Sequence, residues 1–146
     1  MKYFFDTSAF VKFYRNEKGT ELVTNIILDN NNQIWIMELA KLEFCSSLYR
    51  RYRNNEITFN DLSEIIELFE NDIKNIQVEP FTNQIIIEAE ILLKRFGKDF
   101  GLRTLDALHL ASCYLISDEN TFFVSSDEYL CKVALLLGLK IINPIK

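Results

Sequence analysis

The chain has 146 residues, of which 49% are hydrophobic, and it contains only four glycines and two prolines. This length and composition predict a single folded domain over residues 1–146 and argue against disorder. The net charge of −5 argues against a general nucleic-acid coat, which would be basic, but does not exclude a nuclease whose metal ions offset clustered acids.

The first half of the chain alternates between short apolar strands and amphipathic helices. Strands are expected over residues 2–5, 33–36 and 76–78. Apolar residues at helical spacing predict helices over residues 8–14, 19–28, 38–53 and 60–73. In the helix over residues 38–53, the buried stripe is predicted to be Leu42, Cys45, Tyr49 and Tyr52.

The second half continues the same alternation. A helix over residues 82–96 is expected to stop at Gly97, and Thr104 is expected to cap a strongly apolar helix over residues 104–116. A strand over 121–124 is followed by a helix over 125–137, with a capping box of Ser125 and Glu128, and by a last strand over 140–142. Such alternation predicts an α/β fold, a doubly wound parallel sheet covered on both faces.

Several classes of protein are excluded by what the sequence lacks. Three widely spaced cysteines with no CxxC pair, together with a single histidine, do not make a zinc site. The longest apolar run, residues 107–116, is about half of the ~20 residues that a membrane span needs. Asp6 interrupts the apolar N-terminal segment, so we expect no signal peptide, no membrane partner and a cytoplasmic location.

Four acidic residues are candidates for chemistry. Asp6 and Asp127 each follow an apolar strand, and they meet at one edge of the sheet if these strands are neighbours. Asp106 lies in the first turn of an apolar helix, and Glu43 lies on the helix that follows the second strand. Carboxylates held together repel each other unless a cation joins them, and Mg²⁺ or Mn²⁺ prefers such oxygen ligands. A divalent metal site is therefore one interpretation of these acids.

The same residues also have structural interpretations. Asp106 and Asp127 would stabilise helix N-termini, Asp6 would cap a turn or helix, and Glu43 would be a surface residue. Two serines either cap helices or bind a ligand, namely Ser8 and Ser125. His109 is interpreted as a packed, hydrogen-bonded side chain. Groups of basic residues are interpreted as solvated helix faces, among them Arg50, Arg51 and Arg53, and Lys12, Arg15 and Lys18.

Taken in order, four pieces of the sequence resemble the PIN-domain ribonucleases, and specifically the VapC toxins of type II toxin–antitoxin systems. The pieces are Phe5-Asp6-Thr7-Ser8-Ala9, Glu43 with Arg50, the segment over residues 103–111, and Val124-Ser125-Ser126-Asp127. Their order and spacing match over nearly the whole chain. The segment before the fourth acid is often Thr-x-Asp in the family and is Ser-x-Asp here, which keeps the hydroxyl group.

The resemblance implies a PIN-like three-layer α/β/α sandwich with about five short parallel strands in the order 3-2-1-4-5. It implies an endoribonuclease that depends on Mg²⁺ or Mn²⁺ and cleaves an RNA substrate. The catalytic, metal-binding acids would be Asp6, Glu43, Asp106 and Asp127, with Asp6 and Asp106 as the central ligands. The hydroxyl groups of Ser8 and Ser125 would line the site. The family also implies a homodimer and a small VapB-like antitoxin as partner.

Three alternatives remain open at this point. The protein would be a PIN-fold RNA-processing nuclease outside a toxin–antitoxin system, or a non-catalytic PIN-fold binding module that acts through its apolar helical surface. A phosphotransfer protein of the receiver or haloacid-dehalogenase type fits poorly. Receivers usually carry paired acids after the first strand, but Phe5 precedes Asp6, and Ser8 stands where a dehalogenase has its second aspartate.

Overall fold

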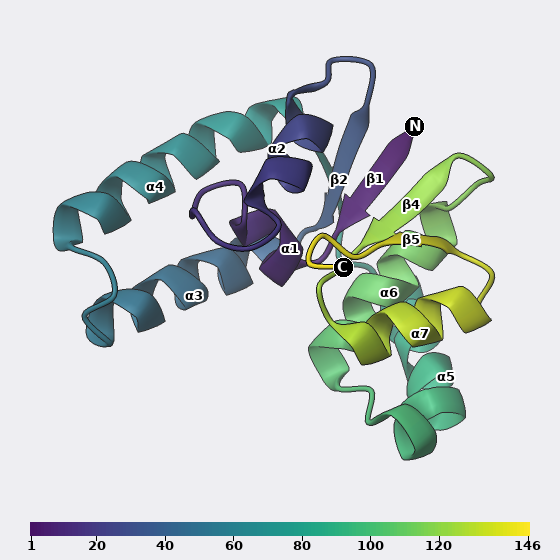
Figure 1. The fold of residues 1–146 in the computed structure, drawn as a ribbon. Helices are drawn as coiled ribbons and strands as arrows, with labels where there is room; N and C mark the ends of the chain where they lie inside the picture. Colours follow the sequence, from purple (N-terminus) through teal and green to yellow (C-terminus); the bar gives the residue numbers. More distant parts are fainter.

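Five parallel strands form one sheet at the centre of the molecule (Figure 1). The structure is a computed structural model that describes residues 1–146. The strands are β1 (Lys2–Phe5), β2 (Gln33–Met37), β3 (Gln77–Glu79), β4 (Thr121–Val124) and β5 (Lys140–Ile142). Their order across the sheet is β3-β2-β1-β4-β5, so the predicted α/β class and the strand order 3-2-1-4-5 are confirmed.

Seven α-helices connect the strands and cover both faces of the sheet. One face is covered by α1 (Thr7–Val11), α2 (Thr20–Leu28), α3 (Ala40–Arg53) and α4 (Phe59–Asp72), and a short 3₁₀ helix, η1 (Ile73–Asn75), precedes β3. The other face is covered by α5 (Asn83–Phe100), α6 (Thr104–Ile116) and α7 (Glu128–Leu136). Figure 1 shows α3 and α4 projecting beyond the sheet, and we call this pair the α3–α4 arm. None of the helices combines the length and the apolar character needed to cross a membrane.

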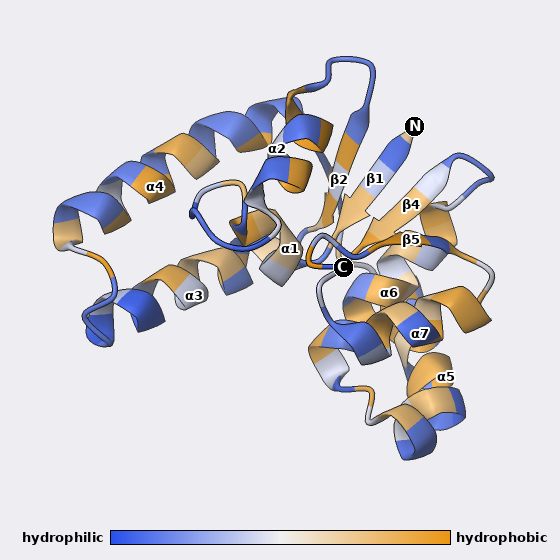
Figure 2. Ribbon diagram, viewed as in Figure 1, coloured by the Kyte–Doolittle hydropathy of each residue, from blue (hydrophilic) through white to orange (hydrophobic).

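Alternating side chains along the strands build two hydrophobic cores. Phe4 and Phe123 belong to the core under α5, α6 and α7, whereas Phe5 and Val124 belong to the core under α1 to α4. Figure 2 shows hydrophobic residues in the strands, and helices in which hydrophobic and hydrophilic residues are mixed. Burial on both faces explains why these strands have continuous apolar sequences, and it confirms the three-layer sandwich.

The predicted buried stripe of α3 is wrong. Three residues of that stripe are exposed, with Leu42 at 68%: Leu42, Tyr49 and Tyr52. The helix buries a different set: Ala40, Phe44 and Leu48. The ring of Phe44 stacks on that of Phe69 in α4, with 4.0 Å between centroids. This aromatic partner selects the buried face, and periodicity within α3 alone does not reveal it.

The starts of two helices and the end of a third also differ from the prediction. Thr104 is the first helical residue of α6 and not its N-cap, which is Arg103. The capping box of Ser125 and Glu128 is wrong, because α7 is capped by Asp127, whose Oδ1 accepts a hydrogen bond from the Leu130 amide at 3.0 Å. The helix predicted over residues 8–14 is too long, since α1 ends at Val11.

The end of α5 lies one turn beyond the predicted stop at Gly97. Phe96 is buried, and its ring packs edge-on against Phe100, with 6.0 Å between centroids. A glycine inside a helix costs about 1 kcal/mol relative to alanine, and this packing outweighs that cost. The helix ends instead at Gly101, whose φ of 62° lies in the left-handed region that favours glycine.

We expect alanine substitutions at these two glycines to have opposite effects on stability. Gly97→Ala should raise the free energy of unfolding by about 0.5–1 kcal/mol, because a Cβ there meets no atom within 4 Å. Gly101→Ala should lower it by about 1 kcal/mol, because alanine is strained at this φ. Urea unfolding of both variants checks this expectation, and shifts in the same direction would contradict it.

Candidate active site

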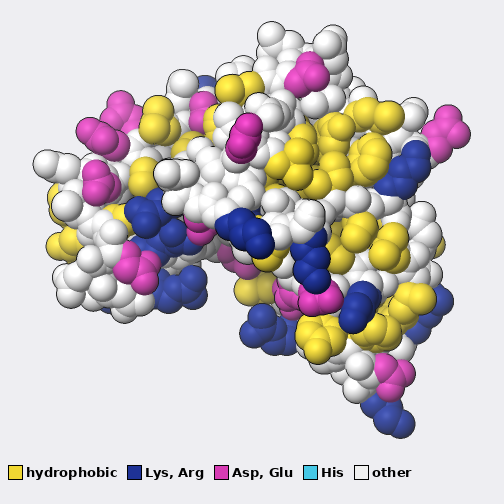
Figure 3. Space-filling view, in the orientation of Figure 1, with side chains coloured by type: hydrophobic (Ala, Val, Ile, Leu, Met, Phe, Trp, Pro, Cys, Tyr) yellow, Lys and Arg dark blue, Asp and Glu magenta, His cyan; other side chains and the backbone are white.

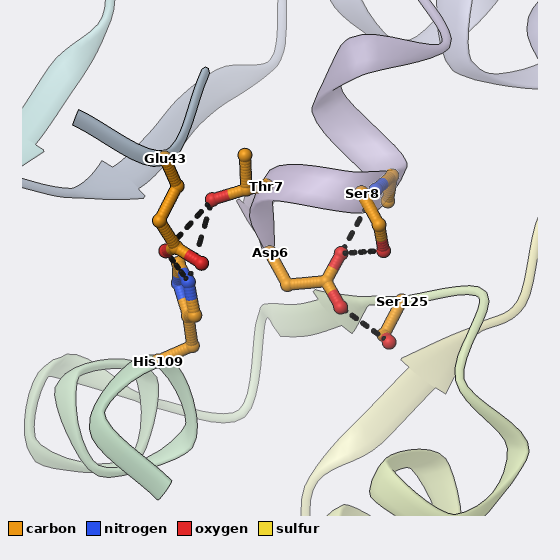
Figure 4. A network of polar contacts seen from close by, with 7 residues as sticks. Asp6, Thr7, Ser8, Glu43, His109 and Ser125 are labelled. Carbon is orange, nitrogen blue, oxygen red and sulfur yellow. Dashed lines mark hydrogen bonds and ion pairs between the residues drawn. The ribbon is translucent and has the colours of Figure 1, made fainter. Parts of the chain in front are cut away.

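Asp6 lies at the edge of the sheet where β1 ends, and it caps α1 (Figure 4). Its Oδ1 accepts hydrogen bonds from the Ala9 amide at 2.9 Å and from Ser8 Oγ at 3.1 Å. Its Oδ2 accepts a hydrogen bond from Ser125 Oγ at 2.6 Å. All three donors belong to the protein, and Asp6 is only 6% exposed.

Burial raises the pKa of Asp6 above its ordinary value. The positive charge of His109 and the hydrogen bonds from Ser125, Ala9 and Ser8 act in the opposite direction but do not outweigh burial. The ionised carboxylate is therefore held in surroundings that solvate it poorly, and a bound cation would relieve that cost.

The pairing of β1 with β4 brings Asp127 to the same edge. Phe5 lies opposite Val124, so the residues that follow the two strands are adjacent, as the sequence led us to expect. Ser125 is fully buried and connects them, because its Oγ donates to Asp6 and accepts a hydrogen bond from the Asp127 amide at 3.1 Å. Ser125 is therefore a buried bridge between two candidate acids and not a helix cap.

Asp106 lies in the first turn of α6, as predicted, and is half-buried. Its pKa is raised by burial and then by the negative charge of Asp127, against the positive charges of Arg103 and His109. Asp106 and Asp127 line the same small cavity of about 190 Å³, and Arg103 Nε lies 3.7 Å from Asp106 Oδ2. The two carboxylates are thus close enough to repel each other.

Glu43 lies in the first turn of α3 and faces the site from the other side. Its Oε1 accepts hydrogen bonds from Thr7 Oγ1 at 3.0 Å and from His109 Nε2 at 2.5 Å. Burial alone would raise the pKa of Glu43, but the hydrogen bond and charge of His109 and the hydrogen bond of Thr7 lower it overall. Glu43 is therefore held as a carboxylate.

Thr7 and His109 are site residues that the sequence reasoning did not place there. His109 is 2% exposed and hydrogen-bonded, as interpreted, but its partner is one of the candidate acids. One signal was available: His109 follows Asp106 by three positions, so both lie on the same face of one helix. For Thr7 the available signal was its position directly after Asp6 in the sequence.

The four acids lie around one edge of the sheet but do not form a closed cluster. Figure 4 shows the Asp6 carboxylate facing Ser8 and Ser125, while Glu43 faces Thr7 and His109. No group of three or more His, Cys, Asp or Glu side chains is arranged to hold a metal ion. The carboxylate oxygens have the chemistry that Mg²⁺ prefers. Coordination that includes Glu43 would use its Oε2, because Thr7 and His109 both contact Oε1.

We expect Asp6→Asn to stabilise the metal-free protein at pH 7, by about 1 kcal/mol. The folded pKa of Asp6 is raised, so its ionised form opposes folding above that pKa. The gain should vanish as the pH falls below about 4, where the carboxyl group is protonated in both states. Urea unfolding with a chelator at both pH values measures this difference, and a loss of stability at pH 7 would contradict the expectation.

Solved structures with the same fold have little sequence identity to this chain. A chain of VapBC2 from Rickettsia felis, bound to a promoter DNA fragment, matches with a TM-score of 0.67 at 14% identity, over 97% of this chain and 98% of that one. VapBC-1 from nontypeable Haemophilus influenzae matches with a TM-score of 0.65 at 15% identity, over 100% of both chains. FitAcB from Neisseria gonorrhoeae matches with a TM-score of 0.67 at 12% identity, over 97% of each chain. At these identities the likeness shows the fold alone.

The sequence itself identifies the family. No curated protein matches the chain at a significant level. The sequence model of the PIN domain, however, matches residues 3–136, a range that includes all four candidate acids and both candidate serines. The resemblance to PIN domains is therefore confirmed, and the chain belongs to the PIN-domain family.

Proposed function

We propose that this protein is a metal-dependent endoribonuclease, and that it is the VapC-like toxin of a type II toxin–antitoxin pair. The observation that carries the proposal is the burial of Asp6 in a network that Ser125 extends to Asp127. Capping α1 does not require this arrangement, because an uncharged serine or threonine caps a helix without burying a charge. A costly buried carboxylate at the ligand-binding edge of an α/β sheet is typical of a functional site.

The roles of the residues follow from their contacts. Asp6 and Asp106 would be the central ligands of Mg²⁺ or Mn²⁺, and Glu43 and Asp127 would complete the site directly or through water. When bound, the ion would polarise the phosphodiester and lower the pKa of the attacking water. Ser8 and Ser125 orient the Asp6 carboxylate by hydrogen bonds.

Thr7 and His109 have the corresponding role for Glu43. Both donate to Oε1, which leaves Oε2 as the oxygen available to a ligand or water. His109 also places a positive charge near Asp6 and Asp106, which offsets part of the rise that burial causes in the pKa of both carboxyl groups. We propose that these two residues keep Glu43 ionised and ready to bind.

We further propose a homodimer in the cytoplasm and a VapB-like antitoxin as partner. The named VapBC assemblies with this fold support the second proposal. The α3–α4 arm supports a protein partner, because it exposes large apolar side chains, namely Leu42, Tyr49, Tyr52, Phe59 and Leu68. Exposed apolar patches of this kind are typical of interaction surfaces.

Asp6→Asn and Asp106→Asn should each lower RNA cleavage in the presence of Mn²⁺ by about 100-fold or more. Even residues that only orient metal ligands contribute about 10- to 100-fold, so loss of a direct ligand should cost at least as much. A gel assay with a labelled single-stranded RNA, and with DNA of the same sequence, measures the effect. Asp99→Asn is the matched control, because Asp99 is exposed on α5 and lines neither cavity beside the site.

Unchanged cleavage by either site variant would reject the proposed metal ligands. If the wild-type protein cleaves no RNA and calorimetry with Mn²⁺ gives no acid-dependent heat, the protein is a binding module and the nuclease proposal fails. If it cleaves RNA but does not arrest growth when expressed, it is an RNA-processing nuclease outside a toxin–antitoxin pair.

A further inference from the structure

A cavity of about 780 Å³ opens beside Glu43, on the side of the site away from Asp127. Thr7 and Ser8 border it together with Glu43. Four of its other lining residues are cationic, namely Lys12, Arg50, Arg51 and Arg103. Figure 3 shows Lys and Arg side chains gathered around the recess between the α3–α4 arm and the rest of the molecule. We call this space the basic cavity, and its charge suits an anion next to the acids.

Lys12 is the most informative of these cations. It follows the last residue of α1 and is only 9% exposed, so it does not belong to the solvated helix face that its sequence suggested. Its ammonium donates no hydrogen bond to another protein group, and its one ion pair, with Glu17 Oε1, is long at 3.6 Å. Lysine is almost never buried unless it is paired, because burial of an ammonium group is costly. Lys12 therefore has donor capacity that the protein itself does not use.

Arg50 and Arg51 extend the same positive charge along α3. Neither forms a salt bridge within the protein, and both line the basic cavity. Cations in the last turn of a helix interact favourably with its dipole, but that explanation applies equally to Arg53, which does not line the cavity. Guanidinium groups bind phosphate through two parallel hydrogen bonds, so these two positions suit phosphate oxygens.

We propose that the basic cavity is a phosphate-binding subsite that holds the RNA backbone next to the cleaved bond. Lys12 binds the phosphate nearest Asp6, and Arg50 and Arg51 bind the phosphate beyond it. This inference rests on the proposed nuclease function and adds the path of the substrate. Because the ligand is phosphate, the subsite binds single-stranded RNA and DNA alike, and the choice between them is made elsewhere.

The carboxylate of Glu17 would compete with a bound phosphate for the ammonium group of Lys12. Glu17 lines the cavity, and its carboxylate is the one group paired with Lys12. A phosphate that binds Lys12 must displace Glu17 or share the ammonium with it. Glu17→Gln should therefore tighten RNA binding by several-fold, because it removes both the competing partner and a nearby negative charge. A purely structural ion pair predicts no gain in RNA affinity.

The test is the binding of a fluorescein-labelled single-stranded RNA, measured by anisotropy with EDTA so that no cleavage occurs. Lys12→Met and Arg50→Ala should each weaken binding about tenfold. Each should also reduce the slope of log affinity against log salt by about 0.7, the value for one lost contact with a single strand. Lys18→Met and Arg53→Ala are matched controls, because both residues are exposed and neither lines the cavity.

Two further measurements keep the result interpretable. Lys12→Arg should restore most of the affinity, and thermal unfolding should show that the Lys12 variants are folded. If Lys12→Met and Arg50→Ala bind RNA as tightly as their controls while the wild type still cleaves RNA, the subsite is rejected and the nuclease function stands. If binding depends on these residues but Mn²⁺ supports no cleavage, the subsite stands and the nuclease function is rejected.

Discussion

The parallel pairing of β1 with β4 is the constraint on which the candidate site depends. It joins two four-residue strands whose following residues, Asp6 and Ser125, are 119 positions apart and hydrogen-bonded at 2.6 Å. Ring stacking across the pair fixes the register on both faces, through Phe4 with Phe123 and Tyr3 with Phe122. A slip by one residue would exchange the two faces of a strand and separate Asp6 from Ser125. The aromatic packing that sets the register of the two strands therefore also sets the geometry of the site.

The same edge concentrates negative charge where water is scarce. Burial raises the pKa of Asp6 and of Asp106, so the fold bears a free-energy cost to keep these carboxyl groups in place. Serine hydroxyl groups and His109 reduce that cost without removing it. They also hold the acids in separate orientations, with Glu43 turned to His109 and Asp6 turned to Ser125. These hydrogen bonds and the charge of His109 thus stabilise the acids in the absence of a metal ion. The same contacts keep the acids from forming a closed metal-binding cluster.

The sequence predicted the strands, their order and the positions of the acids, because these features follow from local runs and from a motif that spans the chain. It failed where the outcome depended on a partner distant in sequence. The predicted stripe on α3 lies on the wrong face because Phe69, the aromatic partner of Phe44, belongs to another helix. The predicted end of α5 is too early because Phe100, beyond the glycine, packs against Phe96 and extends the helix. The sequence places Ser125 in a capping box because a serine suits both a helix cap and a hydrogen-bonded bridge between two acids. Only the pairing of β4 with β1 distinguishes these two roles.

The misassigned face of α3 has a consequence for chemistry. On a helix that turns about 100° per residue, Glu43, Ser47 and Arg50 lie on one side of the buried line through Phe44 and Leu48, and Tyr49 lies on the other. Burial of Leu42 and Tyr49 would have rotated Glu43 away from Thr7 and His109. The stacking of Phe44 on Phe69 at 4.0 Å instead turns that side toward α1 and α6, where Thr7 and His109 bind Glu43. One aromatic contact in the core thereby sets the positions of both Glu43 at the sheet edge and Arg50 beside the basic cavity.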